Sequence, residues 1–292
     1  MPDISLDGVG LDRLEIFVEG LDHPEGVTTG PNGDVYAGGE AGQVYRVDVT
    51  NRTLEQVGST GGFLLGVTLD AAGRVYACDT KNLAVMRLDP GGGEATAWST
   101  GTAARPMVNP NMLVFAADGF AYVTDSGHFD AADGCIFRVA PDGRTDVWCD
   151  TSRNFPNGAC LDVEGTGLYV AESTGVPALV HIEISGDGRA GRRRIVAELP
   201  GTVPDGVALD AEGNAYVTCY RPDRVVRVSP GGRLEVLAED PRGTIIAATT
   251  NATFAGPDLR TCVIANLGRW HLTSADFGIP GLALRYPDLG SA

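Results

Sequence analysis

A short pattern recurs six times along this chain of 292 residues and constrains the fold more than any other feature. Most copies contain a turn with Pro or Gly, a short apolar strand, a hairpin turn and a second strand centred on Tyr or Val. The copies are 40 to 48 residues apart, which is the period of propeller blades. One shared position, which we call the marker position, is occupied in the six copies by Glu25, Leu65, Asn111, Asn157, Asp205 and Asn251.

Third and fourth strands follow in most copies, for example at 43–47 and 55–57, and long helical periodicity is essentially absent. The sequence therefore predicts an all-β fold, a six-bladed β-propeller with four-stranded antiparallel blades, as a single domain over residues 1–292. A single unit cannot bury its own faces, so the ring must close. We expect residues 14–18 to supply an outer strand to the last blade and residues 279–284 to complete the closure.

Composition excludes several classes of partner. The net charge is −16, so phosphate backbones and anionic lipids would be repelled, and neither nucleic acid nor membrane is expected as a partner. No apolar segment has transmembrane length, no secretory signal is visible, and the six cysteines have no CxxC spacing. These features predict a cytoplasmic monomer with reduced, mostly buried thiols that acts on a small molecule.

The marker position predicts a metal site. First strands line the channel of a propeller, so equivalent positions lie at equal height around its axis. Buried carboxylates are costly unless they are paired or bind metal. Two carboxylates with amide oxygens form a hard ligand set that suits Ca²⁺ best, with Mg²⁺, Mn²⁺ and Zn²⁺ as the other candidates. The alternative is a network of hydrogen bonds and water that plugs the channel. The expected metal ligands are Glu25, Asn111, Asn157 and Asp205.

Other residues near the same channel mouth are candidates for a substrate pocket. His128 follows the second strand of the third copy, where it would shuttle protons or shape the pocket; a solvent-facing histidine without a function is the alternative. The expected pocket residues are Leu65, Asn109, Asn251, Phe129 and Tyr220, with Phe63 and Trp270 as further walls.

These motifs resemble those of the senescence marker protein/gluconolactonase family, the regucalcin-like lactonases. The matches are His-Pro-Glu-Gly at 23–26, Pro-Asn at 110–111, Asn-Gly at 157–158 and Pro-Asp-Gly at 204–206, and the resemblance extends from about residue 14 to 286. It implies a metal-dependent hydrolase that opens lactones or related esters at a divalent cation. It also implies two roles for Asp205, as a metal ligand and as the general base.

The chain departs from that family at two positions. Sugar lactonases of the family carry an arginine two residues before the metal-binding asparagine, where this chain has Asn109, and the second copy presents Leu65 to the channel. Both differences favour a less polar substrate. Asp205 would activate water or attack the carbonyl itself. The alternatives to a hydrolase are a propeller that serves as a binding or scaffold module and a metal-independent condensing enzyme similar to strictosidine synthase.

Overall fold

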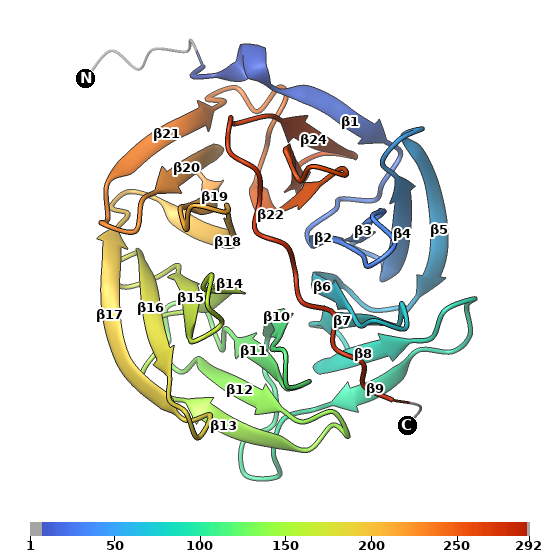
Figure 1. Ribbon diagram of the computed structural model, residues 1–292, viewed down its shortest axis with the longest axis vertical. Coiled ribbons are helices and arrows are strands. Elements are labelled where there is room, and N and C mark those ends of the chain that lie inside the picture. The colour runs from blue at the N-terminus through green and yellow to red at the C-terminus, as the bar shows by residue number, and fades with distance from the viewer. Residues whose placement is uncertain (1–7, 291–292) are drawn as a thin grey trace.

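The computed structural model describes residues 8–290 and, within them, folds six four-stranded antiparallel sheets into a ring (Figure 1). The predicted six-bladed β-propeller is confirmed. The strands nearest the axis are β2 (Val27–Thr29), β6 (Leu64–Leu69), β10 (Pro110–Phe115), β14 (Pro156–Leu161), β18 (Val203–Leu209) and β22 (Thr249–Ala255). The second strands are β3 (Val35–Gly38), β7 (Val75–Asp79), β11 (Ala121–Asp125), β15 (Gly167–Glu172), β19 (Ala215–Arg221) and β23 (Thr261–Asn266).

The outer half of each blade is more exposed. The third strands are β4 (Gln43–Asp48), β8 (Ala84–Leu88), β12 (Cys135–Val139), β16 (Ala178–Ile184), β20 (Arg224–Val228) and β24 (His271–Ala275). The outermost strands are β5 (Thr53–Ser59), β9 (Thr96–Ser99), β13 (Thr145–Cys149), β17 (Ala190–Glu198), β21 (Leu234–Glu239) and β1 (Glu15–Glu19). A single 3₁₀ turn, η1 (Leu11–Arg13), precedes β1 in the described residues.

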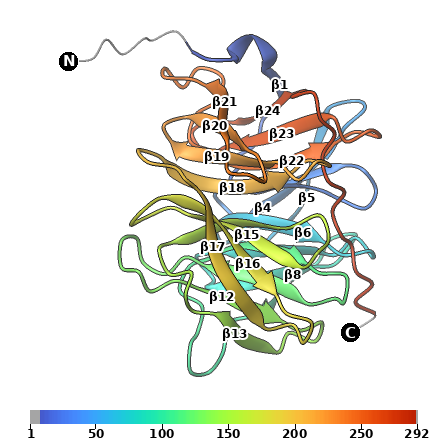
Figure 2. The ribbon, with the colours of Figure 1, turned by 60° about the vertical axis from the view of Figure 1, so that its left-hand side comes forward.

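The ring closes through the first strand of the chain. β1 pairs antiparallel with β24, with Glu15 opposite Ser274 and Glu19 opposite His271, so the last blade combines both ends of the propeller sequence. This confirms the expectation for residues 14–18. The expectation that residues 279–284 complete the closure was wrong, because this segment adds no strand to a blade. It crosses one end of the channel instead, where Leu282 N donates to Leu209 O at 2.8 Å (Figures 1 and 2).

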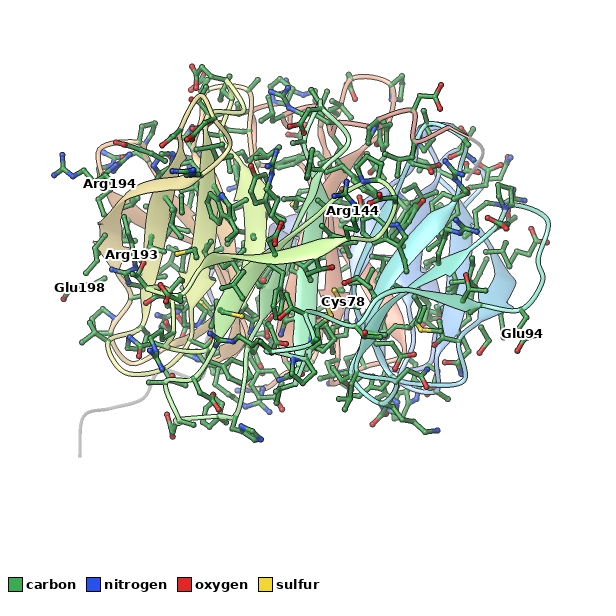
Figure 3. The ribbon with its side chains drawn as sticks, turned by 90° about the horizontal axis from the view of Figure 1, so that it is seen from below. Cys78, Glu94, Arg144, Arg193, Arg194 and Glu198 are labelled. Atoms are coloured by element: carbon green, nitrogen blue, oxygen red, sulfur yellow. The ribbon has the colours of Figure 1, made fainter. Side chains whose placement is uncertain are left out.

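Apolar side chains fill the spaces between neighbouring blades. The ring of Tyr76 in β7, for example, packs edge-on against Phe115 in β10 with centroids 5.1 Å apart. Charged side chains such as Arg194 and Glu94 lie at the outer surface, while Cys78 lies in the interior (Figure 3). All six cysteines are free thiols, five of them buried. No helix among residues 8–290 is long and apolar enough to cross a bilayer.

Candidate functional site

The four predicted metal ligands meet at one end of the channel. Glu25, Asn111, Asn157 and Asp205 line a single cavity of about 310 Å³. Their exposed fractions are only 3 to 5%. The structure therefore brings together the four residues that the sequence predicts as metal ligands.

Local strand irregularity explains why these side chains face the axis. The antiparallel register shifts at the start of the inner strands, between Pro110 and Met112 in β10 and between Pro156 and Ala159 in β14. A β-bulge removes a residue from the regular ladder and changes the direction of its side chain. The preceding prolines suit this position because they have no amide hydrogen to give to the ladder.

A glycine after the marker residue allows neighbouring blades to approach closely. A Cβ on Gly158 would overlap the carbonyl oxygen of Asp205, and a Cβ on Gly206 would overlap that of Thr250. The same relation joins Gly26 to the carbonyl of Leu65. Only glycine fits such an approach of backbone to backbone. The glycines therefore set the distance between adjacent marker residues around the channel.

Three oxygens of this cluster are buried without a hydrogen-bond partner among residues 8–290. They are Oδ1 of Asn111, Oδ1 of Asn157 and Oδ1 of Asp205. The amide of Asn157 is oriented by its Nδ2, which donates to Ser173 Oγ at 3.3 Å, so its oxygen is left free. Buried polar atoms without partners are rare in proteins, because each loses its hydrogen bonds to water.

The two carboxylates of the cluster also lack a cationic partner among the described residues. Burial raises the pKa of Glu25 and of Asp205 well above the usual carboxyl range, and the charge of Asp205 raises the pKa of Glu25 further. Neither carboxylate forms an ion pair with any cationic side chain in the described part of the chain. The cluster thus combines two carboxyl groups with two amide oxygens that accept no hydrogen bond from the described residues. This set of oxygens fits a hard divalent cation, which prefers oxygen ligands.

The structure corrects the sequence alignment in the sixth blade. Thr249 pairs with Asn266 as Pro110 pairs with Asp125, so Thr250, and not Asn251, occupies the marker position. Thr250 lines the cavity, whereas Asn251 does not. Asn251 is nevertheless buried beside the cluster, where its Nδ2 donates to Glu25 Oε2 at 3.3 Å. It therefore contacts a candidate metal ligand rather than the pocket.

The remaining predicted residues divide into two groups. Leu65, Asn109, Phe129 and Tyr220 line the cavity, as does Phe63. His128 does not: its side chain is 70% exposed and its Nδ1 lies 2.8 Å from Asp133 Oδ2. Trp270 lies outside the cavity too, with its ring 4.9 Å from that of His23.

Sequence reasoning missed several lining residues, namely Thr80, Phe155, Val203, Thr250 and Leu267. Two of them carried a signal. Phe155 and Val203 precede their marker residues by two positions, as Phe63 and Asn109 do. Because the repeat places equivalent residues at equal height, residues two positions before the marker position are expected to form the rim of the cavity.

Buried carboxylates at the ends of second strands hold the loops that lead into the site. Asp125 is 3% exposed, and it accepts hydrogen bonds from the backbone amides of Val108 at 2.7 Å and Asn109 at 2.9 Å. These contacts fix the backbone just before Asn111. Asp79 does the same for the second blade, where it accepts from Phe63 N at 3.2 Å.

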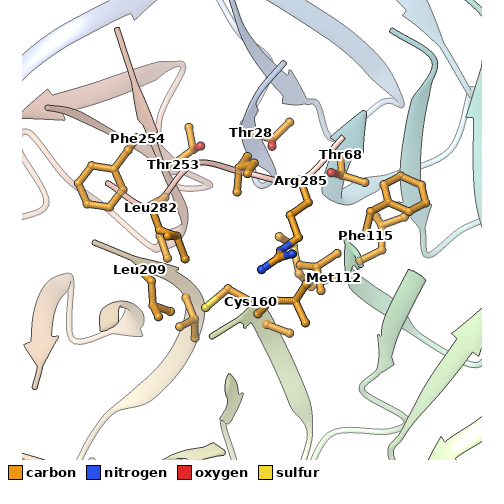
Figure 4. Close-up of a pocket in the computed structure, with 18 of the residues that line it drawn as sticks. Thr28, Thr68, Met112, Phe115, Cys160, Leu209, Thr253, Phe254, Leu282 and Arg285 are labelled. Atoms are coloured by element: carbon orange, nitrogen blue, oxygen red, sulfur yellow. The ribbon is translucent and has the colours of Figure 1, made fainter. Parts of the chain in front are cut away.

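Two other features are separate from this cavity. A smaller cavity of about 80 Å³ lies at the opposite end of the channel, under the C-terminal segment, with Arg285 reaching over apolar side chains (Figure 4). It holds no pair of carboxylates. On the rim of the first blade, Asp22, His23 and Glu40 bring their ligating atoms within 4.8 Å of one another, and His23 Nδ1 already lies 3.1 Å from Asp22 Oδ1.

The fold and the cluster together define a six-bladed β-propeller with a candidate metal site at one mouth of its channel. Comparison with known proteins identifies a family of such propellers. Residues 23–267 match the model of the SMP-30/Gluconolactonase/LRE-like region, and the chain belongs to this family.

Curated relatives include a gluconolactonase of Zymomonas mobilis, 25% identical over 187 residues that cover 57% of this chain and 51% of the relative. Human regucalcin is 32% identical over 162 residues, 54% of this chain and 50% of the relative. The chain thus matches about half the length of these relatives.

Solved structures support the fold. A gluconolactonase of Xanthomonas campestris superposes with a TM-score of 0.76 at 21% identity, over 91% of this chain and 89% of the other. A calcium-binding regucalcin of Agrobacterium tumefaciens gives a TM-score of 0.73 at 18% identity, over 98% of both chains.

Proposed function

We propose that this protein is a metal-dependent lactonase that opens a lactone or a related ester at the channel mouth. One observation carries the proposal. Three buried oxygens without a hydrogen-bond partner among the described residues lie in one cavity with the buried carboxylate of Glu25. Family membership and the gluconolactonase among its relatives support the reaction class. An all-oxygen set suits Ca²⁺, Mg²⁺ or Mn²⁺ better than Zn²⁺, and the calcium-binding regucalcin among the similar structures supports Ca²⁺ as the first candidate.

Glu25, Asn111, Asn157 and Asp205 would hold the cation, and the two carboxylates would supply the negative charge. When bound, a divalent cation polarises an ester carbonyl and stabilises the negative charge that develops on its oxygen. The side chain of Asn157 is already oriented by its hydrogen bond to Ser173 Oγ, so its oxygen needs little rearrangement to bind.

Asp205 is the candidate for the proton transfer. Its Oδ1 has no partner among the described residues and Asp205 lines the cavity, so we assign to this carboxylate the proton of an attacking water. General-base assistance of this kind contributes about 10²–10⁴-fold to a rate. Direct attack of the same carboxylate on the carbonyl carbon is the second route, and trapping of an acyl-enzyme in a single turnover distinguishes it from the first.

The proposal is tested by metal content and thermal stability of the wild type and Asp205→Asn, before and after chelation. We expect a stoichiometric divalent cation in the wild type, a fall in its melting temperature after chelation, and loss of both metal and lactone hydrolysis in Asp205→Asn. Asp162→Asn is the matched control, because Asp162 lines the cavity at the opposite end of the channel.

Two outcomes would overturn the proposal. One is lactone hydrolysis that persists after complete chelation. The other is a protein that binds no divalent cation and hydrolyses no lactone, which would favour a binding module or a metal-independent condensing enzyme.

A further inference from the structure

The cavity has a polar floor and apolar walls. Above the acid–amide cluster, the lining consists mainly of aromatic and aliphatic side chains: Phe63, Leu65, Phe129, Phe155, Val203, Tyr220 and Leu267. Binding sites with this composition remove apolar groups from water and orient them with a few polar contacts. The reacting end of a ligand would thus lie at the floor and its remainder against hydrocarbon.

The walls offer little to a charged or polyhydroxylated ligand. Apart from the cluster and the Tyr220 hydroxyl, the polar lining residues are Thr80, Asn109 and Thr250, and Thr250 Oγ1 already donates to Glu25 O at 2.7 Å. No lysine, arginine or histidine lines this cavity in the part of the chain that the structure describes. Each hydroxyl that enters without a partner loses its hydrogen bonds to water, which is unfavourable.

An aromatic pair, one exposed ring and one partly buried ring, lies at the mouth of the cavity. Phe129 is 60% exposed, and its ring lies edge-on to that of Phe155 with centroids 5.2 Å apart. Phe155 holds a positive φ of 54°, a conformation that bulky residues rarely adopt. Exposed aromatic side chains that gather at a pocket mouth typically contact a ligand.

The loop that carries Phe129 is fixed from several sides. The carboxylate of Asp133 contacts His128, Arg105 Nη2 donates to Gly134 O at 3.1 Å, and Arg153 Nε donates to Ala132 O at 2.8 Å. A loop held in this way presents its aromatic ring without an additional ordering cost when a ligand binds.

We propose that the substrate of this site is a lactone that carries an aryl or alkyl substituent and no charged group. This inference rests on the proposed lactonase function and specifies its substrate class. Hydrolysis consumes one water: the acyl carbon–oxygen bond of the ring breaks, the water oxygen bonds to the acyl carbon, and a hydroxycarboxylate and a proton are released. The substituent packs against Phe129 and Phe155 while the carbonyl faces the floor.

Three lactones with the same five-membered ring test the proposal. They are γ-butyrolactone, γ-phenyl-γ-butyrolactone and ribono-1,4-lactone, assayed with the metal-loaded wild type. We expect kcat/KM for the phenyl compound to exceed that for the unsubstituted ring by at least about tenfold, since apolar groups in hydrophobic pockets give discrimination of this order. Equal or faster turnover of ribono-1,4-lactone would overturn the inference and leave the lactonase function standing.

A matched pair of variants assigns the preference to the rim. Phe129→Ala is expected to raise KM for the phenyl lactone by roughly tenfold with kcat little changed, because the contact contributes to binding and not to chemistry. Trp270→Ala is the control, since Trp270 is 57% exposed and lies outside the cavity. An equal effect of both variants would contradict the assignment.

Binding of an unreactive analogue separates the inference from the function it rests on. Calorimetry with γ-phenyl-γ-butyrolactam, the amide counterpart of the phenyl lactone, measures recognition without turnover. Lactam binding that Phe129→Ala weakens, together with no hydrolysis of any lactone, would overturn the lactonase function and support the ligand class. Neither binding nor hydrolysis of the phenyl compounds would overturn both.

Discussion

At the scale of single residues, the site depends on the glycines that follow Glu25, Asn157 and Asp205 as well as on these side chains themselves. Asn157 and Asp205 belong to neighbouring blades. Gly158, which follows Asn157, packs directly against the backbone carbonyl of Asp205. The Asn157 side chain supplies one candidate ligand oxygen, and Gly158 sets how closely the blade that carries Asp205 can approach it.

Replacement of that glycine should therefore be destabilising. We expect Gly158→Ala to lower the free energy of unfolding by about 1–3 kcal/mol, because the new methyl group overlaps the carbonyl of Asp205. Gly186→Ala is the control: its Cβ would meet no atom within 4 Å, so the change should stay within about 0.5 kcal/mol. Urea denaturation of both variants checks the difference, and equal stabilities would contradict it.

His128 gives a second prediction at this scale. Because its side chain is exposed and bonded to Asp133, His128→Ala should leave kcat for a small lactone within about twofold of the wild type. A general acid or base at this position would require a loss of about 10²-fold or more. Steady-state rates for γ-butyrolactone decide between the two roles.

At the scale of elements, β1 determines whether the ring closes. It is the first strand in the chain, yet it pairs with β24, the third strand of the sixth blade. Its side chains therefore contact residues that are distant in sequence. Phe17 is 3% exposed and packs among residues of the first and last blades, whereas Ile16 on the same strand is 41% exposed.

The difference in burial between Phe17 and Ile16 predicts unequal costs of truncation. Phe17→Ala should lower the free energy of unfolding by about 3–5 kcal/mol, the range for loss of a buried aromatic side chain. Ile16→Ala should cost far less, about 1 kcal/mol or below. Denaturant midpoints of the two variants measure this, and similar midpoints would show that β1 is not needed to close the ring.

The elements also show how far the sequence alone can predict the structure. Five blades begin with recognisable turns, so their inner strands and the four candidate ligands are correctly placed. The sixth begins Thr249-Thr250-Asn251, with neither proline nor a following glycine, and only the pairing with Asn266 fixes the register. The position of His128 outside the cavity could not be predicted for another reason: its neighbours in sequence lie near the mouth, but the direction of its side chain depends on Asp133 in the same loop.

At the scale of the whole molecule, buried polar groups at the blade interfaces link stability to pH. Burial raises the pKa of Tyr76, Tyr216 and Tyr286 to about 12. Tyr286 also donates its hydroxyl to Thr29 O at 2.7 Å and so attaches the C-terminal segment to the first blade.

These tyrosines predict a loss of stability at high pH. The folded state keeps their protons up to about pH 12, while the unfolded chain releases them near pH 10. Unfolding therefore releases protons in this window, and the free energy of unfolding falls as pH rises through it. Urea midpoints between pH 9 and 12 measure the trend for the wild type. Tyr286→Phe should flatten it, and an unchanged slope would contradict the assignment.

The C-terminal segment has a kinetic consequence. It crosses the end of the channel opposite the acid–amide cluster, where Leu282 and Arg285 line the smaller cavity, so it obstructs passage on that side (Figure 1). A molecule that enters the site must leave by the way it came, and each product has to depart before the next reactant can arrive. A product that keeps its affinity for the site should then slow a reaction curve well before the reactant is exhausted, in the manner of a competitive inhibitor.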